Sequence, residues 1–319
     1  MTPPTLQDVY AARRRIAPYV PRSPLMKHPQ LDVESGLDLW IKHENHNPTG
    51  AFKVRGGVNL VGSLSPEERA RGIVTASTGN HGQSIALAAR LNGTSCTVFV
   101  PRGNNPEKNA AMRAFGATVE EGGHDFDDAR GRCEQRAAET GARYVHSANE
   151  PLLIAGVGTY ALELFEQIPD VDVVLVPVGG GSGACGLITV RNALGSRTRI
   201  VGVGAAEADA IARSWRGPDR VVGSSASTFA EGIATRVTFD LTFGIMKQHL
   251  DDFVLLTEDE LAEGVRVALR TTHNLAEGAG SASIAAAMKL GETLAGQRVA
   301  CVMSGGNLDQ AKLRWLLGA

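Results

Sequence analysis

One lysine in the sequence lies in surroundings that suit covalent chemistry. Lys53 follows Phe52 and precedes the glycine pair Gly56 and Gly57, beside an expected helix start. A lysine that acts as a nucleophile or forms a Schiff base needs a lowered pKa, and burial near a helix N-terminus supplies one. The alternative is a surface lysine, because charged side chains mostly lie on the outside of a protein.

A run of glycines gives the strongest purely physical signal in the chain. Four of the five residues from 179 to 183 are glycine, and they directly follow the apolar stretch 173–178 and open an expected helix. Consecutive glycines let the backbone wrap around a phosphate, and the helix dipole adds attraction for its charge. The residues of this candidate phosphate site are Gly179, Gly180, Gly181, Ser182 and Gly183.

Two further turns carry hydroxyl groups beside expected strand ends. Residues 76–82 read Ala-Ser-Thr-Gly-Asn-His-Gly, where short hydroxyls and helix N-terminal N–H groups can hold a carboxylate. Ordinary helix capping is the alternative there, and a lone histidine such as His81 is more often packed or exposed than catalytic. Ser304 ends the last expected strand, where its hydroxyl can bond a ligand ring atom or form part of a tight turn.

A dinucleotide site is an alternative interpretation of the glycine run. The residues from Gly181 to Gly186 match the pattern G-x-G-x-x-G after a strand and before a helix, and Glu207 and Asp209 follow the next expected strand. Against this alternative, the run starts two residues too early and is richer in glycine than the pattern needs. An NAD enzyme also leaves the lysine and serine motifs unexplained.

Strands and helices alternate along most of the 319 residues. Apolar runs and alternating patterns predict strands over 37–44, 72–77, 96–100, 117–120, 142–146, 173–178, 199–203, 253–256 and 298–303. Helical spacing and caps predict helices over 6–16, 79–91, 106–115, 126–140, 152–167, 182–194, 258–272, 282–290 and from 308 onward. This order predicts an α/β protein whose mostly parallel sheets carry helices on both faces, with ligands bound at the strand-to-helix turns.

Composition excludes several classes of protein. Hydrophobic residues make up 43%, charged residues 21%, and the net charge is -2, which disfavours both a disordered chain and a broad nucleic-acid surface. No apolar stretch is long enough to cross a membrane, and the N-terminus lacks a signal-peptide core, so we expect a cytoplasmic protein with no membrane contact. Four scattered cysteines without a CxxC pair predict neither a zinc site nor disulfides.

Taken in order, the four motifs resemble those of the threonine and serine dehydratases and the serine racemases. These are pyridoxal-phosphate (PLP) enzymes of the tryptophan-synthase β-like fold, known as fold type II. The resemblance runs from about Pro24 to Asn307, and the stretches 154–159 and 277–281 support it. It implies a large PLP-binding domain of residues 1–71 and 150–319, a small domain of residues 72–149 that closes over an amino-acid substrate, and a homodimer.

The resemblance also implies a role for each motif. Lys53 would form the imine with PLP and later move the Cα proton, with Phe52 beside the cofactor ring. Asn80 would bind the phenolic oxygen of PLP, Ser304 would face its pyridine nitrogen, and the run from Gly179 to Gly183 would bind its phosphate. The substrate carboxylate would be received by Ser77, Thr78, Gly79 and His81.

Four features bear on the implied activity. A neutral Ser304 opposite the pyridine nitrogen favours a weaker electron sink and concerted loss of a β-hydroxyl group. Thr78 stands where racemases carry a catalytic serine, and its hydroxyl allows some racemisation. Arg213 replaces an acidic ligand in the segment 207–213, which binds a cation in some relatives, so we expect no metal there. Glu277 would lie near the ring with no assigned role.

The leading hypothesis is therefore PLP-dependent β-elimination of a β-hydroxy amino acid to a 2-keto acid and ammonia, with serine, threonine or a bulkier 3-hydroxy amino acid as substrate. Four alternatives remain open: an amino-acid racemase, a β-replacement synthase, an NAD-dependent oxidoreductase and a binding protein without catalysis. The short stretch after Asn307 leaves no room for a regulatory domain, so we expect no feedback control by isoleucine.

Overall fold

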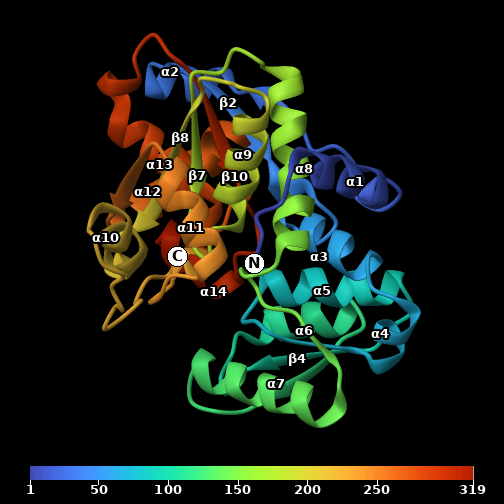
Figure 1. The fold of residues 1–319 in the computed structure, drawn as a ribbon. Helices are drawn as coiled ribbons and strands as arrows, with labels where there is room; N and C mark the ends of the chain where they lie inside the picture. The colour runs from blue at the N-terminus through green and yellow to red at the C-terminus, as the bar shows by residue number, and fades with distance from the viewer. Residues whose placement is uncertain (319) are drawn as a thin grey trace.

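Two β-sheets organise the chain, and the computed structural model describes residues 1–318 (Figure 1). The larger sheet has the order β1-β2-β10-β7-β8-β9 and is parallel except for the pair β1 and β2. The smaller sheet has the order β5-β4-β3-β6 and is parallel throughout. These sheets confirm the predicted α/β class. The strands are β1 (Leu25–Lys27), β2 (Asp38–His43), β3 (Ile73–Ala76), β4 (Cys96–Val100), β5 (Thr118–Glu121), β6 (Arg143–Tyr144), β7 (Val173–Pro177), β8 (Arg199–Ala205), β9 (Asp252–Leu256) and β10 (Arg298–Met303).

Helices cover both faces of the larger sheet. The central strand β7 is buried at every position, as expected for a parallel strand covered on two sides. A capping box of Thr5 and Asp8 starts the first helix. One face of the sheet packs against α1 (Leu6–Ile16), α8 (Pro151–Gln167), α9 (Ser182–Ala193), α10 (Ala210–Arg216) and α11 (Asp240–His249). The other face packs against α2 (Pro29–Ser35), α12 (Glu258–Thr272) and α13 (Gly278–Leu290), with α14 (Gln310–Leu317) against α12.

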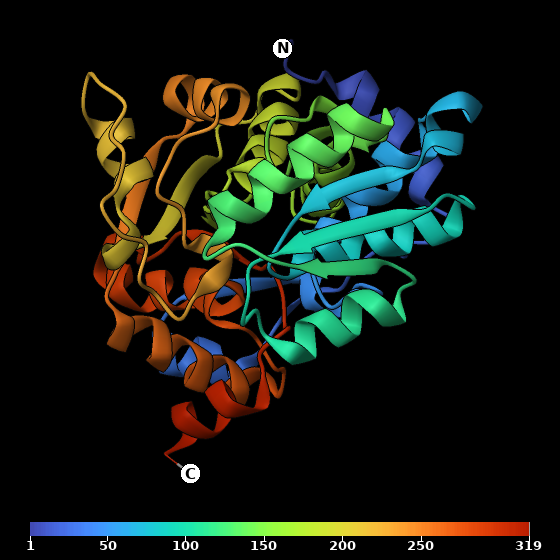
Figure 2. The same cartoon turned by 90° about the horizontal axis from the view of Figure 1, so that it is seen from below.

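The smaller sheet is sandwiched in the same way. Helix α7 (Phe126–Thr140) packs on one face, while α5 (Asn80–Leu91) and α6 (Pro106–Ala114) pack on the other, so that β4 lies between α6 and α7 in Figure 1. Figure 2 shows this sheet beside the larger one, seen from below. The short helix α4 (Pro66–Arg71) leads into β3.

Helix α3 (Lys53–Gly62) packs closely against helices of both halves. Its apolar residues share one core cluster with α5 and the smaller sheet. Glycines allow the close approach: a Cβ atom on Gly57 would overlap Ser84 of α5, and one on Gly156 of α8 would overlap the carbonyl oxygen of Arg55. The domain limits inferred from the sequence place α3 in the large domain, but α3 shares its core with residues beyond 72. These limits therefore stay a prediction.

The structure corrects the predicted elements in several places. Strand β6 has two residues where the sequence predicts five, and α13 starts at Gly278 instead of residue 282. Glycine weakens a helix prediction, yet Gly280 is needed because a Cβ there would overlap the carbonyl oxygen of Gly305. Five short elements were not predicted from the sequence, although α4 starts with a capping box of Ser65 and Glu68: β1, α2, α4, α10 and α11. Within residues 1–318, no helix is both long and apolar enough to span a bilayer.

Candidate active site

Lys53 is the first residue of α3, and its side chain points toward the larger sheet. Its Nζ atom donates to Oγ of Ser182 at 3.0 Å and to the carbonyl oxygen of Ser147 at 3.3 Å. Nζ also lies 5.3 Å from the ring centre of Phe52. The side chain keeps some exposure, but protein surrounds the ammonium on most sides, and this loss of hydration lowers the pKa of Lys53 to about 8.

The glycine run forms the turn between β7 and α9. Gly181 has a φ of +87°, in the left-handed region that favours glycine. A Cβ atom on Gly179 would overlap the carbonyl oxygen of Gly232, which is backbone and cannot rotate away. Within residues 1–318, the N–H groups of residues 179–183 have no protein acceptor. They are free to bind an anion at the N-terminus of α9.

The loop before α5 combines capping with free donors. Oγ of Ser77 accepts from the N–H of Gly79 at 3.2 Å and from that of Gly82 at 2.8 Å, so this hydroxyl caps the helix. The N–H groups of Thr78, Asn80 and His81 find no protein acceptor in the described part of the chain. Three backbone donors at a helix N-terminus therefore remain for a carboxylate.

His81 turns its imidazole away from this loop. Nε2 lies 3.0 Å from Oγ1 of Thr75, which itself donates to the carbonyl oxygen of Val145 at 2.8 Å, so Nε2 carries the proton. Burial lowers the pKa of His81 to about 3, and the ring is neutral. Within residues 1–318, Nδ1 of this ring is buried without a hydrogen-bond partner, and the backbone N–H of His81 is the donor left to face a ligand.

Ser304 lies directly beside the lysine segment. Its carbonyl oxygen accepts from the N–H of Phe52 at 3.0 Å, and the next residue, Gly305, pairs with Ala51. The Ser304 hydroxyl is buried and donates to the carbonyl oxygen of Ala279 at 3.3 Å. The end of β10, the start of α3 and the start of α13 therefore meet at one point.

Asn80 contacts two residues on the far side of the site. Its Nδ2 donates to Oε1 of Glu277 at 2.6 Å, and its Oδ1 accepts from Nδ2 of Asn307 at 2.7 Å. Burial raises the pKa of Glu277, while the cations of Lys108 and Lys312 act in the opposite direction. The four sequence motifs thus converge on one site between the two sheets.

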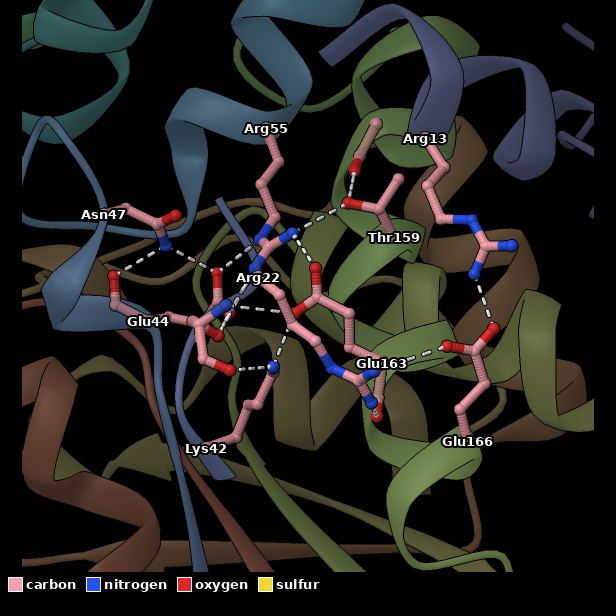
Figure 3. Close-up of polar contacts among 11 residues, drawn as sticks. Arg13, Arg22, Lys42, Glu44, Asn47, Arg55, Thr159, Glu163 and Glu166 are labelled. Atoms are coloured by element: carbon pink, nitrogen blue, oxygen red, sulfur yellow. Dashed lines mark hydrogen bonds and ion pairs between the residues drawn. The ribbon is translucent and has the colours of Figure 1, made fainter. Parts of the chain in front are cut away.

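Figure 3 shows a buried group of charges around Arg55 that was not predicted from the sequence. Arg55 is fully buried, and its guanidinium pairs with Glu44 (Nε–Oε2, 2.7 Å) and with Glu163 (Nη1–Oε1, 2.7 Å). Lys42 pairs with the same Glu163 at 2.5 Å. Two cations face two carboxylates, which is the balance that buried charges require. The available signal was Lys42 near the end of strand β2 and Glu44 directly after it, next to the apolar residues 39–41.

The segment 207–213 contains a partly exposed ion pair. Nη1 of Arg213 lies 3.6 Å from Oδ1 of Asp209. Within residues 1–318, no group of three or more His, Cys, Asp or Glu side chains is arranged to hold a metal ion. That the site works without a metal stays a prediction.

The fold and the site together define a class of protein. A lysine faces an anion-binding glycine turn at the carboxyl edge of a parallel sheet, an arrangement that suits a cofactor with both an aldehyde and a phosphate. The sequence profile of the family described as pyridoxal-phosphate dependent enzyme matches residues 16–305, and the chain belongs to this family. PLP is therefore its cofactor, and the free N–H groups of residues 179–183 fit a phosphate.

Individual relatives are similar over almost the whole chain. An L-threonine ammonia-lyase of Thermotoga maritima is 38% identical, over 96% of this chain and 76% of its own length. A beta-hydroxyaspartate dehydratase of Paracoccus denitrificans is 32% identical, over 98% of this chain and 99% of its own. The solved structure of maize serine racemase superposes with a TM-score of 0.93 at 28% identity, covering 99% of this chain and 98% of that one. The family match leaves the NAD alternative without support.

Proposed function

We propose that the chain catalyses the β-elimination of a β-hydroxy amino acid, releasing a 2-keto acid and ammonia. The observation that carries this proposal is the position of Lys53, whose Nζ lies 3.0 Å from Ser182 of the glycine turn and whose pKa is lowered to about 8. Similarity to ammonia-lyases and dehydratases over nearly the full chain supports the reaction class. Serine, threonine and 3-hydroxyaspartate are the substrates to test first.

Each group in the site has a task in this reaction. PLP, when bound, supplies the electron sink for the pair released at the substrate Cα. The free N–H groups of residues 179–183 hold its phosphate and Asn80 its phenolic oxygen. The Ser304 hydroxyl donates to its pyridine nitrogen in place of the Ala279 carbonyl oxygen, without adding a charge. Phe52 packs at the edge of the cofactor pocket. The free N–H groups of the loop from Ser77 to His81 hold the substrate carboxylate.

Lys53 moves the proton. With a pKa of about 8, its amine is an effective base near neutral pH once it is released from the cofactor. It takes the Cα proton, and the β-hydroxyl leaves as water with one proton, equal in number to the one that Lys53 has taken up. A Cα–Cβ double bond forms, with no net gain or loss of protons. Hydrolysis of the released unsaturated amine consumes one water and gives the 2-keto acid and ammonia, so the atoms balance.

Racemisation is the second candidate activity, and Thr78 is the residue that favours it. Its hydroxyl makes no hydrogen bond with the protein within residues 1–318, so it is available to return a proton to the substrate. The fold similarity to maize serine racemase is consistent with this alternative. A hydroxyl without a neighbouring base is a weak proton donor, so we expect racemisation to be the slower reaction.

A substrate screen tests the proposal directly. The purified holoenzyme would be incubated with serine, threonine, 3-hydroxyaspartate and phenylserine, in both configurations at Cα and, where they exist, at Cβ. Keto-acid release and the enantiomeric ratio of remaining substrate would both be followed. We expect 2-keto acid from at least one isomer. Inversion at Cα without any keto acid would replace the lyase by the racemase, and neither product with a fully loaded cofactor would remove both.

The assembly and the motion of the chain are further proposals. We propose that residues 72–149, which contain the whole smaller sheet, close over the substrate bound to the remainder. We also propose that the protein forms a homodimer. A cytoplasmic location is in keeping with four cysteines that are all unpaired and buried. Light scattering after size-exclusion chromatography tests the dimer, and small-angle scattering with and without a non-reactive substrate analogue tests the closure.

A further inference from the structure

Asn307 and Glu277 lie on either side of the Asn80 side chain, and neither has a task in the reaction above. Asn80 stands at the start of α5, Glu277 immediately before α13 and Asn307 after β10, so three separate segments meet at one amide. Both contacts are short, at 2.6 Å to Glu277 and 2.7 Å to Asn307. A cavity of about 10 Å³, roughly the size of one water molecule, adjoins Glu277 and Asn307.

The hydrogen bonds leave only one orientation for the Asn80 amide. Nδ2 of Asn307 donates to the carbonyl oxygen of Thr49 at 2.8 Å. A carbonyl oxygen can only accept, so the nitrogen of Asn307 must lie on this side. Its second N–H then points at Asn80, which must present Oδ1. The Asn80 nitrogen is thereby turned toward Glu277, and one of its two N–H groups remains free.

The Glu277 carboxyl is fixed just as firmly. Its backbone N–H donates to the carbonyl oxygen of Gly305 at 3.1 Å, and Oε1 would lie 2.7 Å from a Cβ atom on Gly305. Only glycine at position 305 leaves room for the carboxyl oxygen beside the Asn80 amide. Glu277 itself is buried. Burial raises the pKa of this carboxyl, against the opposing effects of Lys108, Lys312 and the hydrogen bond from Asn80.

We infer that Asn307 and Glu277 are positioning residues that lock the Asn80 amide so that its free N–H points at the phenolic oxygen of PLP. This inference rests on the proposed contact between Asn80 and the cofactor. A donor held toward the phenolic oxygen stabilises the form in which the proton lies on the lysine nitrogen. An amide turned the other way would present Oδ1 and repel the same oxygen. Glu277 acts here by accepting the hydrogen bond from Nδ2 of Asn80.

Four variants test the lock without any substrate. Asn307→Asp removes both N–H groups that fix Asn80, and Asn80→Ala removes the locked donor itself. Glu277→Gln keeps a carbonyl oxygen that can accept from Asn80, whereas Glu277→Ala keeps none. Ser283→Ala is the matched control, because it deletes a buried 2.9 Å hydrogen bond between the same helix α13 and the carbonyl oxygen of Val302. The readouts are the cofactor absorption spectrum across pH and the dissociation constant of PLP.

We expect Asn307→Asp and Glu277→Ala to shift the cofactor absorption in the same direction as Asn80→Ala and to weaken PLP binding about tenfold, the loss of about 1.4 kcal/mol expected for one hydrogen bond. Glu277→Gln and Ser283→Ala should stay within about twofold of the unaltered protein. Thermal melting of the cofactor-free variants checks that each is folded.

Three results would overturn the inference. One is an Asn307→Asp protein with normal absorption and PLP affinity alongside an altered Asn80→Ala protein. The second is a Ser283→Ala protein that changes as much as Asn307→Asp, which would make the effect one of general packing. The third is an unaltered Asn80→Ala spectrum, which would remove the underlying contact as well. None of these results bears on keto-acid release by the unaltered enzyme, which tests the proposed function separately.

Discussion

The Nζ atom of Lys53 lies 3.0 Å from Oγ of Ser182, although 129 positions separate the two residues in the chain. Lys53 begins α3 and Ser182 begins α9, so the contact joins two helix N-termini. A cationic side chain is thereby held where two helix dipoles favour an anion. The repulsion between the ammonium and the two helix dipoles is removed when the lysine is neutral or when a phosphate occupies the glycine turn. This explains why the site suits a phosphorylated aldehyde.

Replacing Lys53 tests the covalent attachment. Lys53→Ala should bind PLP only reversibly and lose keto-acid release by at least about 10³-fold, because both the attachment point and the base are missing. Borohydride reduction followed by peptide mass spectrometry should find the cofactor on residue 53 of the unaltered protein. Lys289→Ala, at an exposed lysine of α13, is the control and should behave normally. A cofactor found on any other lysine would refute the assignment.

Cofactor uptake should depend on pH in a way that reports the lowered pKa of Lys53. Only the neutral amine attacks an aldehyde, so in the cofactor-free protein the uptake rate should rise about tenfold per pH unit below pH 8 and level off above it. Stopped-flow absorbance from pH 6 to 10 measures this profile. Free Nα-acetyl-lysine, run in parallel, corrects for ionisation of PLP itself and should keep rising beyond pH 9. A protein profile that also rises beyond pH 9 contradicts the lowered pKa.

The buried charges around Arg55 should be strongly coupled in their contributions to the free energy of unfolding. Glu163→Gln leaves the cations of Arg55 and Lys42 facing a single carboxylate and should cost about 3–5 kcal/mol of the free energy of unfolding. Adding Lys42→Met restores one cation to one carboxylate, so the double variant should be more stable than Glu163→Gln alone. Urea titration measures both. If the changes in the free energy of unfolding of Glu163→Gln and Lys42→Met simply add in the double variant, the charges act independently.

Two glycines of the phosphate turn should respond differently to alanine. At Gly179 a Cβ would overlap the carbonyl oxygen of Gly232, so Gly179→Ala should lower the free energy of unfolding by about 1–3 kcal/mol and weaken PLP binding. At Gly183 the nearest atom to a Cβ is 3.6 Å away, in ordinary contact. Gly183→Ala should keep its stability. Melting curves and PLP titration distinguish the two variants. Equal losses of stability and PLP affinity would show that the turn does not have the described conformation.

Substitutions at Thr78 should distinguish elimination from racemisation. Thr78→Ala should abolish inversion at Cα while keeping keto-acid release within about tenfold, because elimination needs only the base on the lysine side. Thr78→Ser restores the hydroxyl and should recover inversion. Chiral chromatography of remaining substrate and a keto-acid assay measure the two products from one reaction. Inversion that persists in Thr78→Ala would assign the second proton transfer to another group.

The sequence predicts the sheets and the four motifs because those features are local. Buried parallel strands such as β7 read as continuous apolar runs, and the glycine turn needs positive φ and close backbone approach, which leave a visible trace in composition. The partners of Asn80 could not be predicted, since Glu277 and Asn307 approach it only after three segments have packed. The inward orientation of the His81 imidazole could not be predicted either, because its acceptor, Thr75, lies on the strand behind it.

Close packing at the base of α3 decides where new specificity can be built. Codons 57 and 156 should stay fixed in any mutant library, because even one added methyl group there would collide with a neighbouring helix and displace the lysine. Thr78 and its neighbours should also stay unchanged, because this loop offers the N–H groups that hold the carboxylate shared by every amino-acid substrate. New specificity must therefore come from positions that face the substrate side chain, outside these two glycines and this loop.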